Sequence, residues 1–143
     1  MYRYILFDFD GTVFDTLEGI TKSVRYAINK RGMDAELSSL RCFAGPPLYD
    51  MYLEHFGGTA EEAEQFVEDY RERYTGIGLY ECRVFPGMRE LLTELRAAGR
   101  MTAVATLKPQ YLAETLLQRE GMTGLFDAIC GSGVEGHDNT KRE

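Results

Sequence analysis

Cysteine is scarce in this chain of 143 residues, and the three cysteines, Cys42, Cys82 and Cys130, lie far apart. An odd number of cysteines without any Cys-x-x-Cys spacing predicts neither a disulfide framework nor a zinc site. Unpaired thiols are typical of a reducing compartment, so we expect a cytoplasmic protein in which these thiols are buried or inert.

Long apolar runs and an excess of positive charge are also missing. The apolar stretches are far too short to span a bilayer, and the first residues lead into a predicted strand rather than a signal peptide. The formal net charge of −7 argues against nucleic acid or an anionic membrane as the main partner. An anionic small substrate remains compatible with this charge, because a bound metal ion reverses its sign locally.

Along much of the chain, short apolar segments typical of strands alternate with segments whose apolar residues have helical spacing. Strands are predicted at 3–9, 101–106 and 126–130, and helices are predicted to open at Pro86-Gly87 and at Pro109. Strands that alternate with helices imply parallel strands joined by right-handed crossovers. The predicted fold class is therefore α/β, with a Rossmann-like parallel sheet of three strands.

The segment 16–82 carries helical patterns and no strand signal. Helical spacing predicts a helix over 17–31, the run 45–47 (Gly-Pro-Pro) predicts a loop before a second helix, and Thr59 with Glu62 has the spacing of a capping box. We expect two domains: a sheet core formed by 1–15 and 83–143, and an all-helical insert over 16–82.

The first predicted strand ends on two carboxylates, Asp8 and Asp10, which lie one residue apart. Two like charges at the end of a buried strand require a positive partner. Ligands of an open parallel sheet bind at the carboxyl ends of its strands, where Thr106 and, after the third strand, Lys141 are also expected. A divalent cation would neutralise the acid pair, and ligands that are all oxygen atoms favour Mg²⁺.

The motif at 8–16, Asp-Phe-Asp-Gly-Thr-Val-Phe-Asp-Thr, resembles the DxDGT motif of the haloacid dehalogenase superfamily of phosphohydrolases. The insert that follows resembles the small helical cap of that superfamily. The run 45–48 (Gly-Pro-Pro-Leu) is similar to the cap loop of the phosphoglycolate-phosphatase-like branch, and 70–74, 78–81 and 104–109 resemble a 5′-nucleotidase-like subgroup. The resemblance covers essentially the whole chain.

The resemblance implies an Mg²⁺-dependent phosphoric monoester hydrolase that acts on a small phosphorylated metabolite through an aspartyl-phosphate. Asp8 would be the nucleophile, Asp10 the general acid and base, and the two together the metal ligands. Thr106 would bind the phosphoryl oxygens, and Lys141 would offset their charge. The residues expected to bind phosphate or substrate are Gly11, Thr12, Lys108, Gly45 and Pro46.

The sequence departs from the family pattern at two places. Leu107 stands where the family has a small polar residue, so we expect Lys108 to contribute in its place. The fourth motif, an acidic strand end that completes the metal site, and the last two strands are expected beyond Lys141. We therefore expect a C-terminally truncated fold whose first strand is an exposed edge. Such an edge is expected either to drive self-association or to be covered by a shift of the helical insert and neighbouring segments.

Alternative interpretations remain open. A phosphomutase on the same fold would return the phosphoryl group to its substrate, and a catalytically impaired phosphate-binding or interaction protein would fit the absence of the fourth motif. An EF-hand is disfavoured, because Val13 replaces the required glycine and a strand leads into the motif. The spacing GxGxxG at 131–136 lacks a following apolar helix, so we interpret it as a flexible loop.

Overall fold

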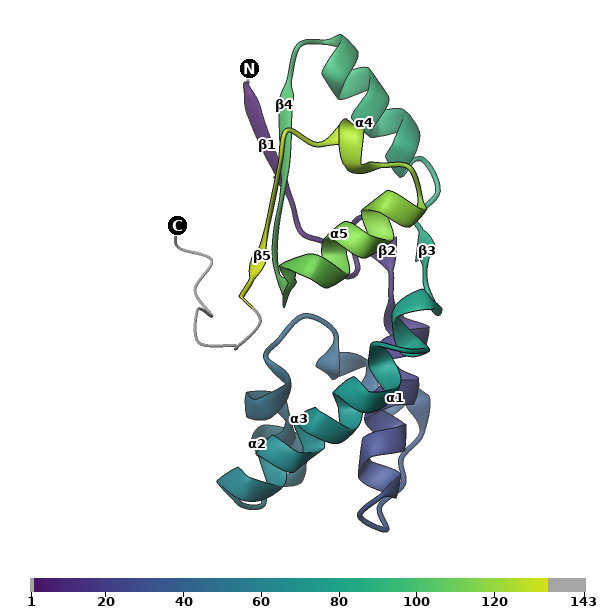
Figure 1. Cartoon of the computed structure of the whole chain (residues 1–143), viewed down its shortest axis with the longest axis vertical. Helices are drawn as coiled ribbons and strands as arrows, with labels where there is room; N and C mark the ends of the chain where they lie inside the picture. The colour runs from purple at the N-terminus through teal and green to yellow at the C-terminus, as the bar shows by residue number, and fades with distance from the viewer. Residues whose placement is uncertain (1, 134–143) are drawn as a thin grey trace. The chain divides into compact units, whose positions relative to one another are not determined.

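The structure is a computed structural model that describes residues 2–133, and these residues separate into two compact units. The helical unit covers Thr16–Cys82, and the sheet unit contains the described residues before and after that segment (Figure 1). Across residues 2–133, no helix combines the length and the apolar character that a membrane crossing requires.

The sheet unit is built on three parallel strands, β1 (Tyr4–Phe7), β4 (Met101–Pro109) and β5 (Ala128–Ser132), in the order β1-β4-β5. Strand β4 is therefore central, and its pairing with β1 ends where Phe7 lies opposite Val104. The predicted α/β class with a parallel sheet is confirmed. The described sheet has three strands, as the sequence pattern indicates.

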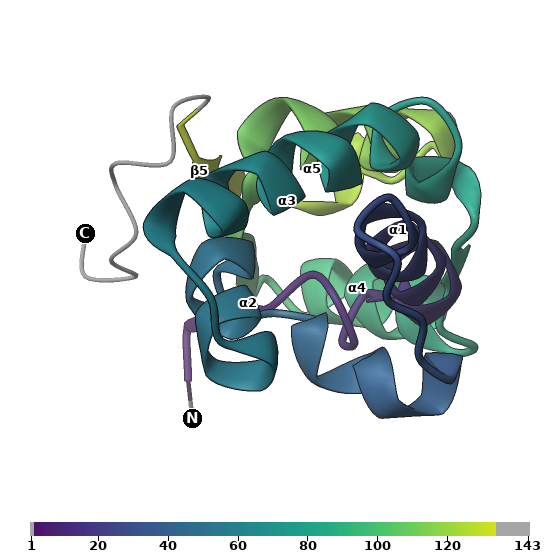
Figure 2. The same cartoon turned by 90° about the horizontal axis from the view of Figure 1, so that it is seen from below.

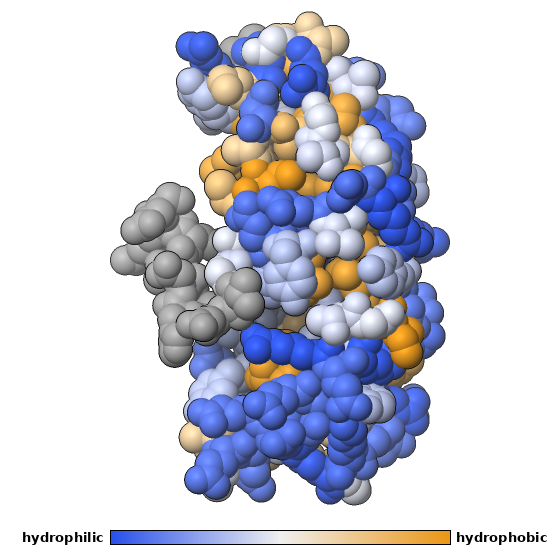
Figure 3. All heavy atoms as spheres, viewed as in Figure 1, coloured by the Kyte–Doolittle hydropathy of each residue, from blue (hydrophilic) through white to orange (hydrophobic). Residues whose placement is uncertain are grey.

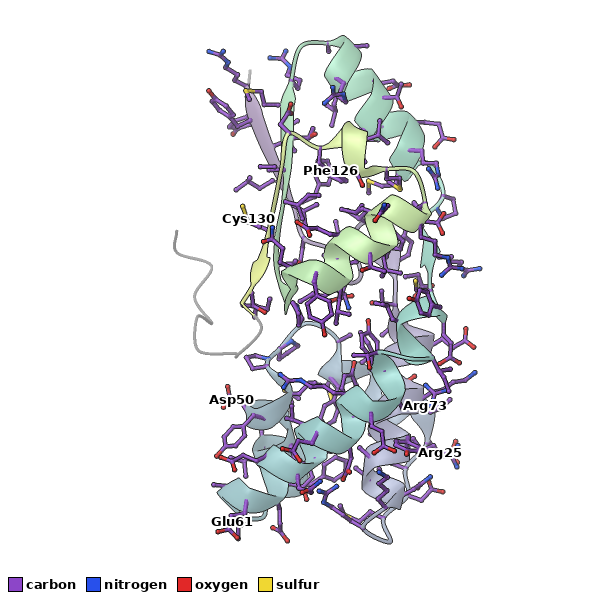
Figure 4. The ribbon with its side chains drawn as sticks, viewed as in Figure 1. Arg25, Asp50, Glu61, Arg73, Phe126 and Cys130 are labelled. Atoms are coloured by element: carbon purple, nitrogen blue, oxygen red, sulfur yellow. The ribbon has the colours of Figure 1, made fainter. Side chains whose placement is uncertain are left out.

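Helices α4 (Met88–Ala97) and α5 (Gln110–Arg119) lie on the same side of this sheet (Figure 1). Along β4, buried residues alternate with more exposed ones, as expected for a strand with one covered face. Figure 4 shows Phe126 on the helix side of the sheet and Cys130 on the opposite side. Cys130 is exposed because the strand alternation directs it away from the helices, and Cys42 is exposed as well, so neither thiol is buried; that they are inert stays a prediction.

A second, two-stranded antiparallel sheet pairs β2 (Phe14–Asp15) with β3 (Arg83–Val84). The pairing is extended by a hydrogen bond of 3.1 Å from the Phe85 N–H to the Val13 carbonyl. Neither strand is predicted from the sequence, because two residues are too few to display an alternating pattern.

Several predicted boundaries are shifted. Strand β1 is shorter than the predicted 3–9, and Pro109 ends β4 and caps α5 rather than opening that helix. Strand β5 begins only after a 3₁₀ turn, η3 (Thr123–Leu125). The interpretation of 131–136 as a loop is wrong at Gly131 and Ser132, which pair within β5. The positions from 134 on lie outside the described residues.

The helical unit contains only helices and their connections, which agrees with the helical pattern of its sequence. Its elements are α1 (Leu17–Asn29), η1 (Leu37–Phe43), α2 (Leu48–Phe56), α3 (Ala60–Tyr74) and η2 (Gly78–Tyr80). Helix α3 contacts both α1 and α2 (Figure 2). The predicted capping box is confirmed: Thr59 and Glu62 exchange hydrogen bonds at the start of α3.

Aromatic side chains fill the interior of the helical unit. Phe66 on α3 stacks on Tyr52 of α2 with ring centroids 4.8 Å apart, and Phe43 lies 5.8 Å from Phe66. All three rings are at most 3% exposed. The outer faces of α2 and α3 present mostly hydrophilic side chains in Figure 3. The helices are therefore amphipathic, and they pack together through their apolar faces.

A buried acid ties the end of α1 to α3. Asp69 accepts hydrogen bonds from Lys30 at 3.3 Å and from Arg31 at 3.0 Å. Burial alone would raise the pKa of Asp69, but the hydrogen bonds from Lys30, Gln65 and Arg31 outweigh burial and hold this pKa below its usual value. The ion pairs therefore compensate the cost of burying this carboxylate.

The closest backbone approach in the helical unit involves two glycines. A Cβ atom added to Gly19 of α1 would overlap the carbonyl of Gly78 in η2, and a Cβ at Gly78 would lie 2.5 Å from Ser23 Oγ. Glycine is therefore required here for space rather than for a positive φ angle.

We expect Gly19→Ala to lower the unfolding free energy by more than about 2 kcal/mol, because the added methyl group would have to displace the backbone of η2. Gly76→Ala is the matched control, since a Cβ there meets nothing within 4 Å. Urea unfolding followed by circular dichroism measures both variants. Equal midpoints for Gly19→Ala and the unsubstituted chain would contradict this packing argument.

The predicted self-association through the first strand stays a prediction, and the structure defines a test. Within the described residues β1 pairs with β4 alone, and its side chains Tyr4 and Leu6 are 63% and 71% exposed. Because an uncovered strand edge favours pairing with a second copy, we expect the chain to form dimers or larger species as its concentration rises. Leu6→Lys should weaken this association, and Leu91→Lys on α4 serves as the control. Light scattering that reports a monomer at every concentration would refute it.

Candidate active site

A compact turn follows β1 and fixes the backbone around the two acids. The Phe9 carbonyl accepts hydrogen bonds from the N–H groups of Thr12, Val13 and Phe14 at 3.0–3.2 Å. Gly11 donates to the Phe14 carbonyl at 2.8 Å and has a φ of +81°, which favours glycine at this position. The turn therefore has one defined shape rather than that of an open loop.

The turn is anchored by apolar packing. Phe9 and Phe14 are fully buried and stack with ring centroids 4.8 Å apart. The sequence alternates apolar and acidic residues here, so burial of Phe9 directs Asp8 and Asp10 away from the packed rings. Asp8 is exposed, and its Oδ1 accepts a hydrogen bond of 2.8 Å from the Phe9 N–H.

Asp10 is less accessible than Asp8. Its side chain is 10% exposed, and its Oδ1 atom is buried without a hydrogen-bond partner. The Nζ atom of Lys108 lies 3.3 Å from this oxygen, close enough for an ion pair but not aligned as a hydrogen bond. The Asp10 carboxylate therefore has a positive neighbour and an unused lone pair on the same oxygen.

The neighbouring strand supplies a hydroxyl group and an ammonium group. Thr106 and Lys108 both lie near the carboxyl end of β4 and are each 7% exposed. Thr106 Oγ1 accepts a hydrogen bond of 3.1 Å from the Lys108 backbone N–H. Because a hydroxyl group can accept and donate at the same time, Thr106 keeps its own proton to donate to a ligand oxygen.

The structure brings part of the predicted site together. Asp10 and Lys108 are in contact, and Gly11 and Thr12 form the turn that carries the acids. Leu107 is half-buried between the two inward residues of β4.

Three other predicted residues lie outside the described part of the sheet unit. Gly45 and Pro46 are exposed residues of the bend before α2 and belong to the helical unit. Lys141 lies outside the described residues, so its predicted role is not tested.

The contacts that shape the end of β4 are not predicted by the sequence pattern. The Gly131 N–H donates to Gln110 Oε1 at 3.0 Å, and a Cβ at Gly131 would lie 2.7 Å from the Lys108 carbonyl. Gly131 thus allows β5 to approach the backbone beside Lys108. The GxGxxG spacing drew attention to this glycine, but for its resemblance to a nucleotide-binding loop rather than for this packing role.

The described residues offer few ligands to a metal ion. Residues 2–133 contain no group of three or more acidic, histidine or cysteine side chains placed to hold a metal. Asp8 provides a carboxylate and Asp10 a main-chain carbonyl, whereas the Asp10 carboxylate oxygen Oδ1 already has the Lys108 ammonium beside it. The pair therefore fits a Mg²⁺ ion only partly, with most of its coordination left to water.

The arrangement is suited chemically to phosphoryl transfer. An exposed carboxylate is available as a nucleophile, a second acid lies two residues on, and a hydroxyl donor and an ammonium group face the same strand ends. These groups lie at the carboxyl ends of parallel strands, where ligands bind in open α/β folds.

Comparison with known proteins agrees with this geometry. The family model described as haloacid dehalogenase-like hydrolase matches residues 5–140. A 5′-nucleotidase of Pseudomonas aeruginosa is 41% identical over 143 residues, which are 99% of this chain and 65% of that protein.

More distant relatives carry different names. A tyrosine-protein kinase PtkA of Mycobacterium tuberculosis is 33% identical, over 97% of this chain and 47% of its own length. A phosphoglycolate phosphatase of Xanthomonas campestris is 28% identical, over 83% of this chain and 55% of its own length. The chain thus spans less than two thirds of each of these relatives.

A solved structure extends the similarity to the fold. The crystal structure of a predicted phosphatase from Clostridium acetobutylicum superposes with a TM-score of 0.94 at 39% identity. The match covers 99% of this chain and 66% of that one. The motif after β1, the family model and the superposed fold agree, and the chain belongs to the haloacid dehalogenase-like hydrolase family.

Proposed function

We propose that the chain is part of a phosphoric monoester hydrolase that acts on a small phosphorylated metabolite. The observation that carries this proposal is the position of Asp8 and Asp10, at the end of β1, beside Thr106 and Lys108 near the end of the adjacent parallel strand. Membership of a hydrolase family supports the same reaction class.

The proposed reaction has two steps. In the first, an Asp8 carboxylate oxygen attacks phosphorus, the bond to the ester oxygen breaks, and Asp10 gives its proton to the departing alcohol. In the second, Asp10 takes a proton from water while the water oxygen attacks phosphorus, which releases inorganic phosphate and regenerates the Asp8 carboxylate. Thr106 donates a hydrogen bond to a phosphoryl oxygen in both steps.

The proposed cofactor is Mg²⁺, which phosphatases of this family generally use. Asp8 through its carboxylate and Asp10 through its main-chain carbonyl are the proposed ligands. When bound, the ion would stabilise negative charge on the phosphoryl oxygens.

The proposed substrates are nucleoside monophosphates or phosphoglycolate. The relative with 41% identity is named a 5′-nucleotidase, and a more distant relative is named a phosphoglycolate phosphatase. Gly45 and Pro46, in the bend before α2, are the proposed substrate contacts of the helical unit. The three cysteines form no disulfide, which supports a cytoplasmic location as part of the same proposal.

A second candidate is a catalytically impaired phosphate-binding protein. It is favoured by the small number of metal-ligating side chains among the described residues. Inorganic phosphate released from a panel of nucleoside monophosphates and phosphoglycolate separates the two candidates. A phosphomutase on the same fold would instead yield an isomer of its substrate.

We expect Asp8→Asn to reduce turnover by orders of magnitude, because the substitution preserves shape but removes the attacking anion. Asp34→Asn is the control, since Asp34 is an exposed acid of the helical unit that pairs with Arg25. Phosphate release under saturating substrate measures both variants. Comparable turnover of Asp8→Asn and the unsubstituted protein would exclude Asp8 as the nucleophile.

We also expect weak Mg²⁺ binding, because this ion prefers six oxygen ligands and retains water where a protein supplies few. Calorimetric titration should give a dissociation constant in about the millimolar range, typical of cation sites with few protein ligands. Submicromolar binding would mean that residues beyond Asp8 and Asp10 complete the site.

A further inference from the structure

Lys108 is a buried cation within the candidate site. Its side chain is 4% exposed, its ammonium lies 3.3 Å from Asp10 Oδ1, and the same Nζ atom is 5.9 Å from the centre of the Phe9 ring. A lysine is rarely buried to this degree unless a negative group and an electron-rich ring compensate the loss of water. The sheet unit supplies both compensating groups from the turn that follows β1.

The backbone of β4 is shaped to bring Lys108 to this position. The strand advances from Ala105 to Pro109 while β5 advances only from Cys130 to Ser132, so the register shifts between these pairs. Lys108 nevertheless remains on the buried face of β4, together with Thr106. The register shift therefore leaves the side-chain alternation of β4 unchanged.

Two contacts hold the bulge in place. The Lys108 N–H is fixed by Thr106 Oγ1 at 3.1 Å, and the Lys108 carbonyl lies against Gly131, where any side chain would collide. Gln110 then closes the bulge by accepting the Gly131 N–H. The position of the ammonium is thus set by the backbone of two strands rather than by a flexible surface side chain.

The charge of Lys108 acts where a metal ion would otherwise be required. An ammonium within 4 Å of a carboxylate compensates most of its charge in a site with little water. A fixed positive charge also repels any further cation that approaches the same carboxylate. Its neutralising effect and its repulsion of metal ions are therefore inseparable.

We propose that Lys108 is the internal counter-ion of the Asp10 carboxylate, that it positions this carboxylate, and that its charge lowers the affinity of the site for divalent cations. The inference rests on the proposed function only in assigning Asp10 to the site. It extends that function by naming a residue of this chain that controls metal affinity.

The test is Mg²⁺ binding to the full 143-residue chain, measured by calorimetry and by the shift in melting temperature on adding Mg²⁺. Lys108→Met keeps the length of the side chain and removes its charge, so it should bind Mg²⁺ at least about tenfold more tightly, as expected for loss of a nearby like charge. Lys108→Arg keeps the charge and should bind within about threefold of the unsubstituted chain. Lys22→Met, at an exposed lysine of the helical unit, should leave Mg²⁺ binding unchanged.

Equal, weaker or undetectable Mg²⁺ binding by a folded Lys108→Met variant would overturn the proposal. If Lys108→Met does not fold, the double variant Asp10→Asn with Lys108→Met should restore folding, because it also removes the unpaired carboxylate. A double variant that remains unfolded would likewise overturn it. These measurements of Mg²⁺ binding and folding test the role of Lys108 without any turnover. The phosphatase proposal is tested separately, by the turnover of Asp8→Asn.

Discussion

The parallel pairing of β1 with β4 is the constraint on which the candidate site depends. It joins the first strand of the chain to a strand that follows the whole helical unit, and the ladder ends at Phe7 and Val104. Because both strands run in the same direction, the residues that follow each of these positions emerge at the same edge of the sheet. The acids come from one strand, and the hydroxyl and ammonium groups come from the other.

The ion pair at this edge is better understood as a means of placing charges than as a source of stability. Desolvating two charges largely cancels their attraction, so a buried pair contributes little net stability compared with apolar residues of similar size. Removing one member is different, since an unpaired buried charge costs about 3–5 kcal/mol. Asp10 and Lys108, with side chains 10% and 4% exposed, therefore constrain each other strongly while adding little to overall stability.

Much of the architecture could be predicted because local signals agree with the final fold. Three local signals each specify one element without a contribution from distant residues. They are the capping box at Thr59, the loop at 45–47 and the apolar segment before Asp8. The acid pair could be recognised for the same reason, because a strand that ends on two acids is unusual by itself. The role of Thr106 followed from its place at the end of a predicted strand.

The features that escaped prediction depend on two distant segments at once. Strands β2 and β3 are two residues each and exist only because Phe14 meets Val84. At the register shift in β4, Gly131 lies close to Lys108. The sequence around neither residue contains a pattern that predicts this contact. The contact of Lys108 with Asp10 likewise joins residues from the ends of two strands, β4 and β1, that are distant in the sequence.

Charge balance at the strand ends connects the counter-ion to the proposed chemistry. Asp8 and Asp10 are two acids and Lys108 is one base, so with both acids ionised the three side chains together are negative. A phosphate ester dianion approaching such a cluster meets net repulsion, which one hydroxyl donor such as Thr106 does not reverse. A further positive charge is therefore needed for phosphoryl transfer at this edge, whether from a bound cation or from another basic side chain. Lys108 compensates the charge of the largely buried Asp10 carboxylate, and the charge of the substrate has to be bound by that additional group.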